Sequence, residues 1–148
     1  MKVNKSTIDE GFMKIALKAA KKAFENNEVP IGAVIVDGGK IVAIGCNSCE
    51  EHQSQMYHAE LVALSQKNSI LTNDASIYVT HEPCPMCLGA LMEAGVKKIF
   101  YGAPEPRWGC LGGVLNLKEK FNLEVQGGIL EKDCIQIIQE FFKIRRKK

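Results

Sequence analysis

The segment Ser76-Ile77-Tyr78-Val79-Thr80-His81-Glu82-Pro83-Cys84-Pro85-Met86-Cys87 is the most informative about the architecture, because it joins a strand to the first turn of a helix. Residues 76–80 are rich in apolar and β-branched side chains, which is typical of a strand. A proline opens a helix over about residues 84–93, and Gly95 ends it. Residues 98–101 again favour a strand. This order implies a crossover connection and a sheet covered by helices on both faces.

The rest of the chain extends this pattern in both directions. Before this segment, we expect a helix that starts at a capping box of Thr7 and Glu10 and ends near Phe24, then a hairpin of strands 31–36 and 40–46. A loop over 45–55 and a helix over 57–66 follow. After the segment, we expect an irregular loop over 102–113, a strand over 123–126 and a final helix over 134–146. The predicted fold class is α/β, a three-layer α/β/α sandwich with a central mixed five-stranded sheet. Residues 1–148 are expected to form a single domain, since domains commonly contain about 100–200 residues.

The composition excludes a disordered chain and leaves nucleic-acid binding open. Hydrophobic residues make up 46% and charged residues 24% of the 148 residues, so a buried core can form. The net charge of +2 neither predicts nor excludes a nucleic-acid partner. Five of the last six residues are basic: Lys143, Arg145, Arg146, Lys147 and Lys148. Without these five, the 19 basic residues become 14 against 17 acidic ones, so the positive charge is concentrated at one end.

No stretch of the sequence is expected to cross a membrane. The sequence contains no run of about 18 apolar residues, and no apolar segment typical of a signal peptide follows Met1. Both observations favour the cytoplasm, where the six cysteines would stay reduced. We interpret Cys110 and Cys134, which stand alone, as buried thiols.

Two short segments carry candidate metal ligands at the starts of predicted helices. Cys84 and Cys87 are three residues apart, so both thiols lie on one helical face, and a helix N-terminus favours the thiolate. His58 can supply a third ligand from another helix start. Two thiolates and one imidazole leave one position of a tetrahedral zinc open, which is typical of catalytic rather than structural sites. We therefore predict one Zn2+ per chain on these three ligands, with Glu60 as the catalytic residue that accepts a proton from water.

A closed site of four cysteines is the alternative for the metal. Cys46 and Cys49 form a second Cys-x-x-Cys pair that could join Cys84 and Cys87. The gap between the two pairs exceeds the roughly 15–20 residues common in such sites. The four-cysteine arrangement also leaves His58 without a role, so the three-ligand site is favoured.

The motifs His58-x-Glu60 and Pro83-Cys84-x-x-Cys87 resemble those of the cytidine-deaminase-like superfamily. Within it, the chain is most similar to the bacterial tRNA adenosine deaminases, over nearly its whole length. Further segments carry this resemblance: Glu28–Val34, Gly45-Cys46-Asn47, Tyr78–Cys84, Gly128–Leu130 and Phe141–Arg146. Two segments depart from the family pattern: Ser54-Gln55-Met56-Tyr57 before the histidine and Pro104–Cys110 in the long loop.

The resemblance implies hydrolytic deamination of adenosine to inosine at the wobble position of a tRNA anticodon. Zinc would be held by the histidine and the two cysteines. Glu60 would pass a proton from water to the ring nitrogen and, after attack at the amino-bearing carbon, would protonate the departing ammonia. The tRNA anticodon stem-loop would be the partner, and members of this family commonly form homodimers. The substrate contacts that the resemblance implies lie at Asn47, Val29 and Phe142.

Some of these residues also have a plainer structural interpretation. Asn47 could satisfy backbone groups at a strand end. Phe141 and Phe142 cannot face the same way, so one is expected in the core and Phe142 in the substrate pocket. Trp108 could stack on a base, pack on its own loop or lie in a dimer interface.

RNA contacts are expected at the basic end of the last helix and in the long loop. The candidate residues are Arg145, Arg146, Lys147, Arg107 and Trp108. A solvated, frayed helix end is the alternative for the three C-terminal residues. RNA bound in this way would have few phosphate contacts and a modest salt dependence.

Two other functions stay open at this point. The same zinc chemistry could act on a free nucleobase or nucleoside of the guanine or cytosine type, since Cys-Pro-Met-Cys also occurs in guanine deaminases. The chain could also be a non-catalytic, zinc-stabilised binding module, although Glu60 and the open zinc position argue against it. The basic end separates the two enzyme alternatives, because a free-base enzyme has no need of it.

Overall fold

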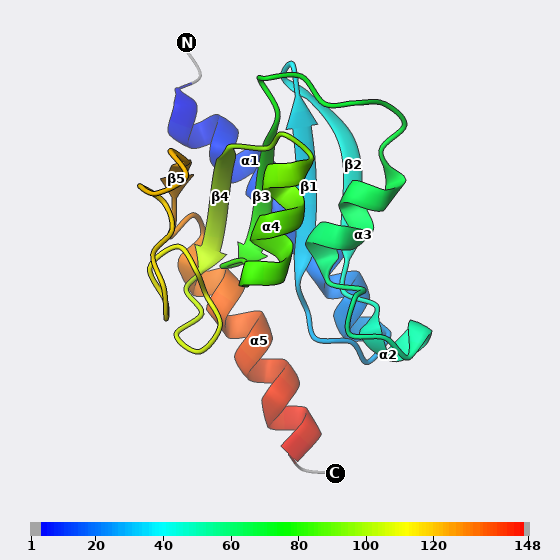
Figure 1. Ribbon diagram of the computed structural model, residues 1–148. Coiled ribbons are helices and arrows are strands. Elements are labelled where there is room, and N and C mark those ends of the chain that lie inside the picture. Colours follow the sequence, from blue (N-terminus) through cyan, green and yellow to red (C-terminus); the bar gives the residue numbers. More distant parts are fainter. Residues whose placement is uncertain (1–3, 147–148) are drawn as a thin grey trace.

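The computed structural model describes residues 4–146 (Figure 1). The elements along this part of the chain are α1 (Lys5–Glu25), β1 (Gly32–Asp37), β2 (Lys40–Cys46), α2 (Cys49–His52), α3 (Ala59–Gln66), β3 (Ser76–His81), α4 (Pro85–Glu93), β4 (Lys98–Ala103), β5 (Glu124–Gln126) and α5 (Glu131–Arg146). The five predicted strands and the four longer predicted helices are all present close to their predicted positions.

The five strands form one mixed sheet in the order β2-β1-β3-β4-β5. β1 pairs antiparallel with both β2 and β3, while β3 pairs parallel with β4 and β4 pairs parallel with β5. A parallel pair needs a crossover connection, and α4 supplies it between β3 and β4. The strand–helix–strand prediction for this segment is therefore confirmed.

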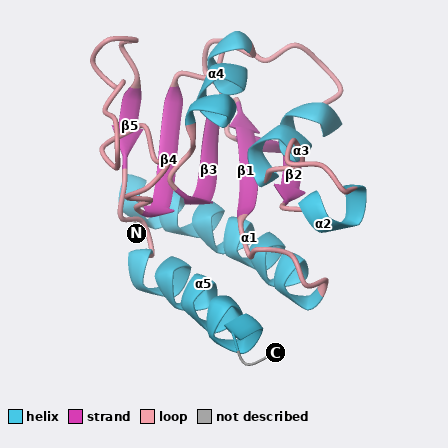
Figure 2. Cartoon of the chain, turned by 60° about the horizontal axis from the view of Figure 1, so that its bottom comes forward, coloured by secondary structure: helices cyan, strands magenta, loops and turns pink. Residues whose placement is uncertain are grey.

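Helices cover both faces of the sheet. α1 and α5 lie on one face, and α3 and α4 lie on the other (Figures 1 and 2). One apolar core, which contains Ile35 and Leu88, lies under α3 and α4. A second core, which contains Met13 and Val34, lies under α1 and α5. The predicted three-layer α/β/α class is confirmed.

Gly45 allows α3 to pack closely against β2. A Cβ atom on Gly45 would lie 2.5 Å from the carbonyl oxygen of Ala59 and 2.5 Å from the amide nitrogen of Ala63. Glycine in β2 therefore lets the first two turns of α3 pack directly on the strand. The start of α3, where His58 lies, is fixed against the sheet by this contact.

The predicted starts of the first and last helices are wrong by a few residues. Asn4, not Thr7, caps α1, because its side-chain oxygen accepts a hydrogen bond from the Thr7 backbone N–H at 2.9 Å. The helix consequently begins at Lys5. α5 begins at Glu131, three residues before the predicted start at Cys134. Acidic side chains in the first turn of α5 interact favourably with the helix dipole.

No helix between residues 4 and 146 combines the length and the apolar character that a bilayer crossing requires.

Candidate active site

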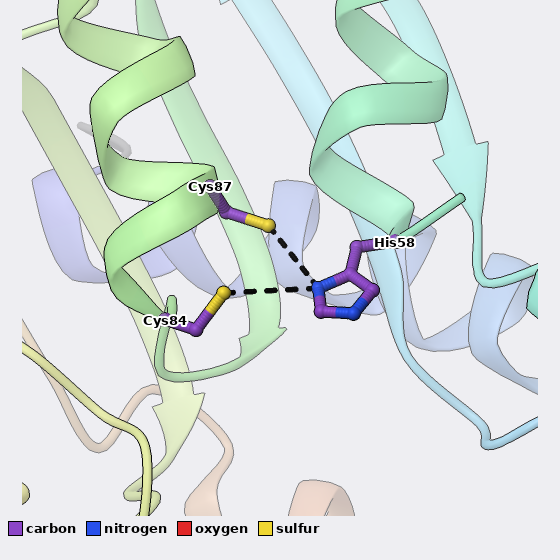
Figure 3. A group of neighbouring side chains, drawn as sticks. All are labelled: His58, Cys84 and Cys87. Atoms are coloured by element: carbon purple, nitrogen blue, oxygen red, sulfur yellow. Dashed lines mark hydrogen bonds between the residues drawn. The ribbon is translucent and has the colours of Figure 1, made fainter. Parts of the chain in front are cut away.

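Three side chains that could bind one metal ion meet at the N-termini of α3 and α4. His58 caps α3, Cys84 caps α4, and Cys87 lies in the first turn of α4. The Sγ atoms of Cys87 and Cys84 lie 3.3 and 3.8 Å from Nδ1 of His58 (Figure 3). All three ligand atoms lie within 4.8 Å of one another, and within residues 4–146 this is the single group of three or more such ligands.

The chemistry of these donors fits zinc. A hydrogen bond with Cys87, together with the nearby His58, holds the pKa of the Cys84 thiol well below its ordinary value. The same contact with Cys84, and burial, raise the pKa of Cys87. Zinc takes thiolate ligands, and one of these two thiols is already poised to ionise. Two sulfur atoms and one nitrogen would leave the fourth tetrahedral position for water or substrate.

The alternative four-cysteine site is not assembled in the described part of the chain. Cys46 and Cys49 are free, and neither joins the metal-ligand group. The Sγ atom of Cys49 instead donates a hydrogen bond to Oδ1 of Asn47 at 3.2 Å. Cys110 and Cys134 are fully buried free thiols, as predicted.

Glu60 lies in the first turn of α3, two residues after His58, and only 4% of it is exposed. Burial raises the pKa of Glu60 to about 7, although the nearby His58 opposes the shift. A carboxyl group with a pKa near neutrality can both accept and donate a proton, as general acid–base catalysis requires.

A cavity of about 910 Å³ opens onto His58, Glu60 and Cys84. Its size lies within the roughly 300–1,000 Å³ of small-molecule sites. Among residues 4–146, the charged residues of its lining are all acidic: Glu28, Glu50, Glu60, Glu82 and Glu105. Since no lysine or arginine of this described part lines it, the cavity favours an uncharged group such as a base and disfavours a phosphate.

Glu28 is a structural residue of the cavity wall that the sequence analysis missed. Its buried carboxylate accepts hydrogen bonds from the backbone N–H groups of Glu50 and Glu51 at 2.9 and 2.8 Å. These N–H groups lie in the first turn of α2, so Glu28 stabilises this single helical turn. The predicted loop over 45–55 was wrong here, because the stabilising carboxylate lies more than twenty residues earlier in the chain.

Glu82 is a second residue that the sequence analysis missed. It is 3% exposed, and its carboxylate accepts hydrogen bonds from the backbone N–H groups of Glu105 at 3.0 Å and of Leu111 and Gly113 at 2.9 Å each. The loop after β4 thus folds around one buried carboxylate. A Cβ on Gly109 would lie 2.3 Å from that carboxylate, which explains a glycine there. The available sequence signal was a charged residue at the end of a buried strand.

The three predicted substrate residues all line the cavity. Val29 lies just before β1, Asn47 just after β2, and Phe142 in the last turns of α5. Asn47 is buried and accepts the hydrogen bond from Cys49. Phe141 is buried, whereas Phe142 faces the cavity, which is the division expected for this pair.

The predicted RNA-binding residues lie outside the cavity or at its rim. Trp108 is 68% exposed and lines the cavity, whereas Arg107 is exposed and does not line it. Arg145 pairs with Glu50 at 3.3 Å, which places the end of α5 next to α2. The Nε atom of Arg146 donates a hydrogen bond to the Phe142 carbonyl oxygen at 3.3 Å. The remaining predicted residue, Lys147, lies outside the described residues.

Comparisons with known proteins agree with this geometry. Residues 6–103 match the family model of the cytidine and deoxycytidylate deaminase zinc-binding region. The tRNA-specific adenosine deaminase of Bacillus subtilis is 44% identical, and the match covers 96% of this chain and 93% of the relative. A solved structure from work on A-to-I editing by tRNA:A34 deaminases is 33% identical, with a TM-score of 0.74 over 86% of this chain and 98% of that one.

The same fold is found in a deaminase that is named for a different substrate. A diaminohydroxyphosphoribosylaminopyrimidine deaminase/5-amino-6-(5-phosphoribosylamino)uracil reductase from Thermotoga maritima is 29% identical, with a TM-score of 0.76, over 97% of this chain and 43% of that one. The shared fold thus accompanies more than one substrate, and the family rests on the zinc-binding region and the extent of sequence identity. This chain belongs to the zinc-dependent cytidine and deoxycytidylate deaminase family.

Proposed function

We propose that this chain hydrolyses adenosine to inosine and ammonia at the wobble position of a tRNA anticodon. The observation that carries the proposal is the buried Glu60 beside the His58, Cys84 and Cys87 group, with Glu60, His58 and Cys84 lining a cavity. The relatives add the substrate, since the Bacillus subtilis protein is named a tRNA-specific adenosine deaminase and matches this chain almost end to end.

His58, Cys84 and Cys87 would hold one Zn2+ per chain. When bound, zinc supplies a Lewis acid that makes water a better nucleophile at neutral pH. Glu60 would accept the proton of the attacking water and deliver it to the adenine ring nitrogen. The water oxygen would bond to the amino-bearing carbon, and Glu60 would take the remaining proton from this oxygen and pass it to the amino group. The carbon–nitrogen bond would then break, so that one water is consumed and one ammonia is released. The buried carboxyl with a pKa of about 7 supports this two-way proton transfer.

The acidic cavity lining supports a base extruded from an RNA loop as the substrate. Adenine is uncharged and can enter, whereas the flanking phosphates would stay at the rim. We propose that Val29, Asn47 and Phe142 contact the bound nucleoside, because all three line the cavity. In this role the Asn47 amide would form hydrogen bonds with the substrate.

The end of α5 and the loop after β4 would contact the RNA outside the cavity. Arg145 and Arg146 would meet phosphates, joined by Lys147 and by Arg107 from the loop, and Trp108 would stack on a neighbouring base. The exposure of Trp108 at the cavity rim supports the stacking role over packing on its own loop.

We also propose a homodimer and a reducing, cytoplasmic setting. Several large apolar side chains are exposed on the loop that follows β4, and they could be buried by a second copy: Val114, Leu115 and Phe121. All six cysteines lie within residues 4–146 and are free, which supports a reducing compartment. Sedimentation analysis of the zinc-loaded protein would measure the oligomeric state.

One experiment tests the proposed function. The zinc-loaded protein is incubated with deacylated tRNA and, separately, with free adenosine, guanine and cytosine, and the released ammonia and the inosine content of the tRNA are measured. Ammonia and wobble inosine from the tRNA are expected. Ammonia from guanine without inosine in the tRNA would favour a free-base deaminase, and zinc binding with no ammonia from any substrate would favour a binding module.

A further inference from the structure

The loop over residues 104–113 forms one rim of the cavity without regular secondary structure. Glu105 and Trp108 line the cavity from this loop, and Trp108 is the only tryptophan in the chain. Because Trp108 is largely exposed, its position depends on how the backbone around it is held. Glu82 anchors the two ends of the loop, but none of its three hydrogen bonds reaches residues 106–110.

Glu105 holds the turn that carries Trp108. Its Oε1 atom accepts a hydrogen bond from the Arg107 backbone N–H at 2.8 Å, and its carbonyl oxygen accepts one from the Gly109 N–H at 2.9 Å. Its Oε2 atom accepts a hydrogen bond from Nε2 of His81 at 2.8 Å. Trp108 therefore lies between two residues whose backbone groups bond to Glu105, and the Glu105 carboxylate is itself held by His81.

His81 is well placed to fix this carboxylate. It is the last residue of β3, in register with Ala103 of β4, so its backbone belongs to the sheet. The His81 and Glu105 side chains are only 16% and 23% exposed, so their contact is shielded from solvent, unlike a surface ion pair. The Nδ1 atom of His81 is buried without a hydrogen-bond partner in the part of the chain that the structure describes. A buried nitrogen without a partner costs free energy that a leucine at this position would not. The hydrogen bond to Glu105 is therefore what a histidine gains here.

We propose that His81 is a positioning residue that acts through Glu105 to present Trp108 at the cavity mouth. With Trp108 held, an unpaired RNA base next to the target base can stack on its indole ring without first ordering the loop. His81 would thereby set the affinity for the nucleotide that flanks the target. This substrate aspect rests on the proposed RNA deaminase function, whereas the positioning of Trp108 does not.

The test compares three variants of the zinc-loaded protein. His81→Leu removes the hydrogen bond, His81→Gln keeps an amide donor at a similar reach, and His52→Leu is a matched control. His52 stacks on Tyr57, with ring centroids 3.8 Å apart, and does not line the cavity. The time-resolved fluorescence anisotropy of the single tryptophan reports the motion of the loop. Zinc content, kcat and KM are measured on an anticodon stem-loop RNA.

His81→Leu is expected to increase the fast anisotropy component of Trp108 and to raise KM about tenfold, as expected for losing a charge-assisted hydrogen bond. Zinc content should be unchanged. The value of kcat should stay within about twofold, because the lost contact stabilises the bound substrate and the transition state equally. His81→Gln should recover most of both effects, and His52→Leu should leave the fast anisotropy component of Trp108 unchanged. Glu105→Ala breaks the same contact from the loop side and should reproduce the phenotype if His81→Leu fails to fold.

Three results would overturn the inference. The first is an unchanged anisotropy decay in both His81→Leu and Glu105→Ala. The second is a fall in kcat and zinc content with KM unchanged, which would mark His81 as a support of the metal site. The third is a His81→Gln variant no closer to wild type than His81→Leu. If the wild type forms no inosine in RNA, the proposed function and the affinity aspect fail together, while the anisotropy still decides whether His81 holds Trp108.

Discussion

The metal-ligand group and the mouth of the cavity are built in different ways. The group takes His58 from one helix start and two cysteines from another, and Glu60 lies in the same turn that follows His58, so most of its geometry is local. The mouth depends on contacts between distant segments, such as Glu28 under α2, Glu82 inside the loop after β4, and the Arg145–Glu50 pair. The residues for the reaction are thus encoded by short motifs, whereas the shape of the mouth depends on tertiary contacts that can change one at a time.

The largest effect is expected from breaking the metal-ligand group itself. Cys87→Ala removes one of three ligands, so zinc content should fall far below one ion per chain and ammonia release should be lost. Cys134→Ala is the matched control, since it removes a buried thiol from the opposite core. Metal analysis and an ammonia assay measure both variants. A Cys87→Ala protein that retains one zinc per chain would contradict the ligand assignment.

The next largest effect separates proton transfer from metal binding. Glu60→Gln keeps the shape of the side chain but removes the proton acceptor, so kcat should fall by about 10²–10⁴. Zinc content should be unchanged, because Glu60 is not in the ligand group. Glu10→Gln, at an exposed position of α1, serves as the matched control. Near wild-type turnover by Glu60→Gln would remove Glu60 from the mechanism.

The same comparison explains how much the sequence could predict. The metal-ligand group was predictable because helix starts and the spacing of two cysteines are local features. The sheet was predictable because apolar strands alternate with helices around the crossover. Glu82 was not, because its hydrogen-bond partners lie 23 to 31 residues away and become visible only after the loop has folded. α2 was missed for the same reason, since Glu28 stabilises it from a distance.

A smaller effect is expected at the mouth, where Glu82→Gln tests the buried anchor. An amide cannot accept from all three backbone N–H groups, so at least one buried donor loses its partner, at a cost of about 1–3 kcal/mol in the free energy of unfolding. KM for RNA should rise while zinc content stays unchanged. Chemical denaturation measures the stability, with the exposed Glu119→Gln as control. A stability change no larger than that of the control would contradict the anchoring role.

The smallest effect is expected at the basic end of α5. Arg145→Gln combined with Arg146→Gln removes two proposed phosphate contacts, so KM for tRNA should rise at low salt, and the slope of log KM against log salt should fall by about 0.7 per lost contact. Activity on free adenosine, where measurable, should be unchanged. The effect is modest because Arg145 already pairs with Glu50 in the free protein and must give up that contact to reach a phosphate.

Lys40→Gln, in the hairpin away from the cavity, is the control. An unchanged salt slope would mean that phosphates are contacted elsewhere. The end of α5 would then not belong to the part of the cavity mouth that binds RNA.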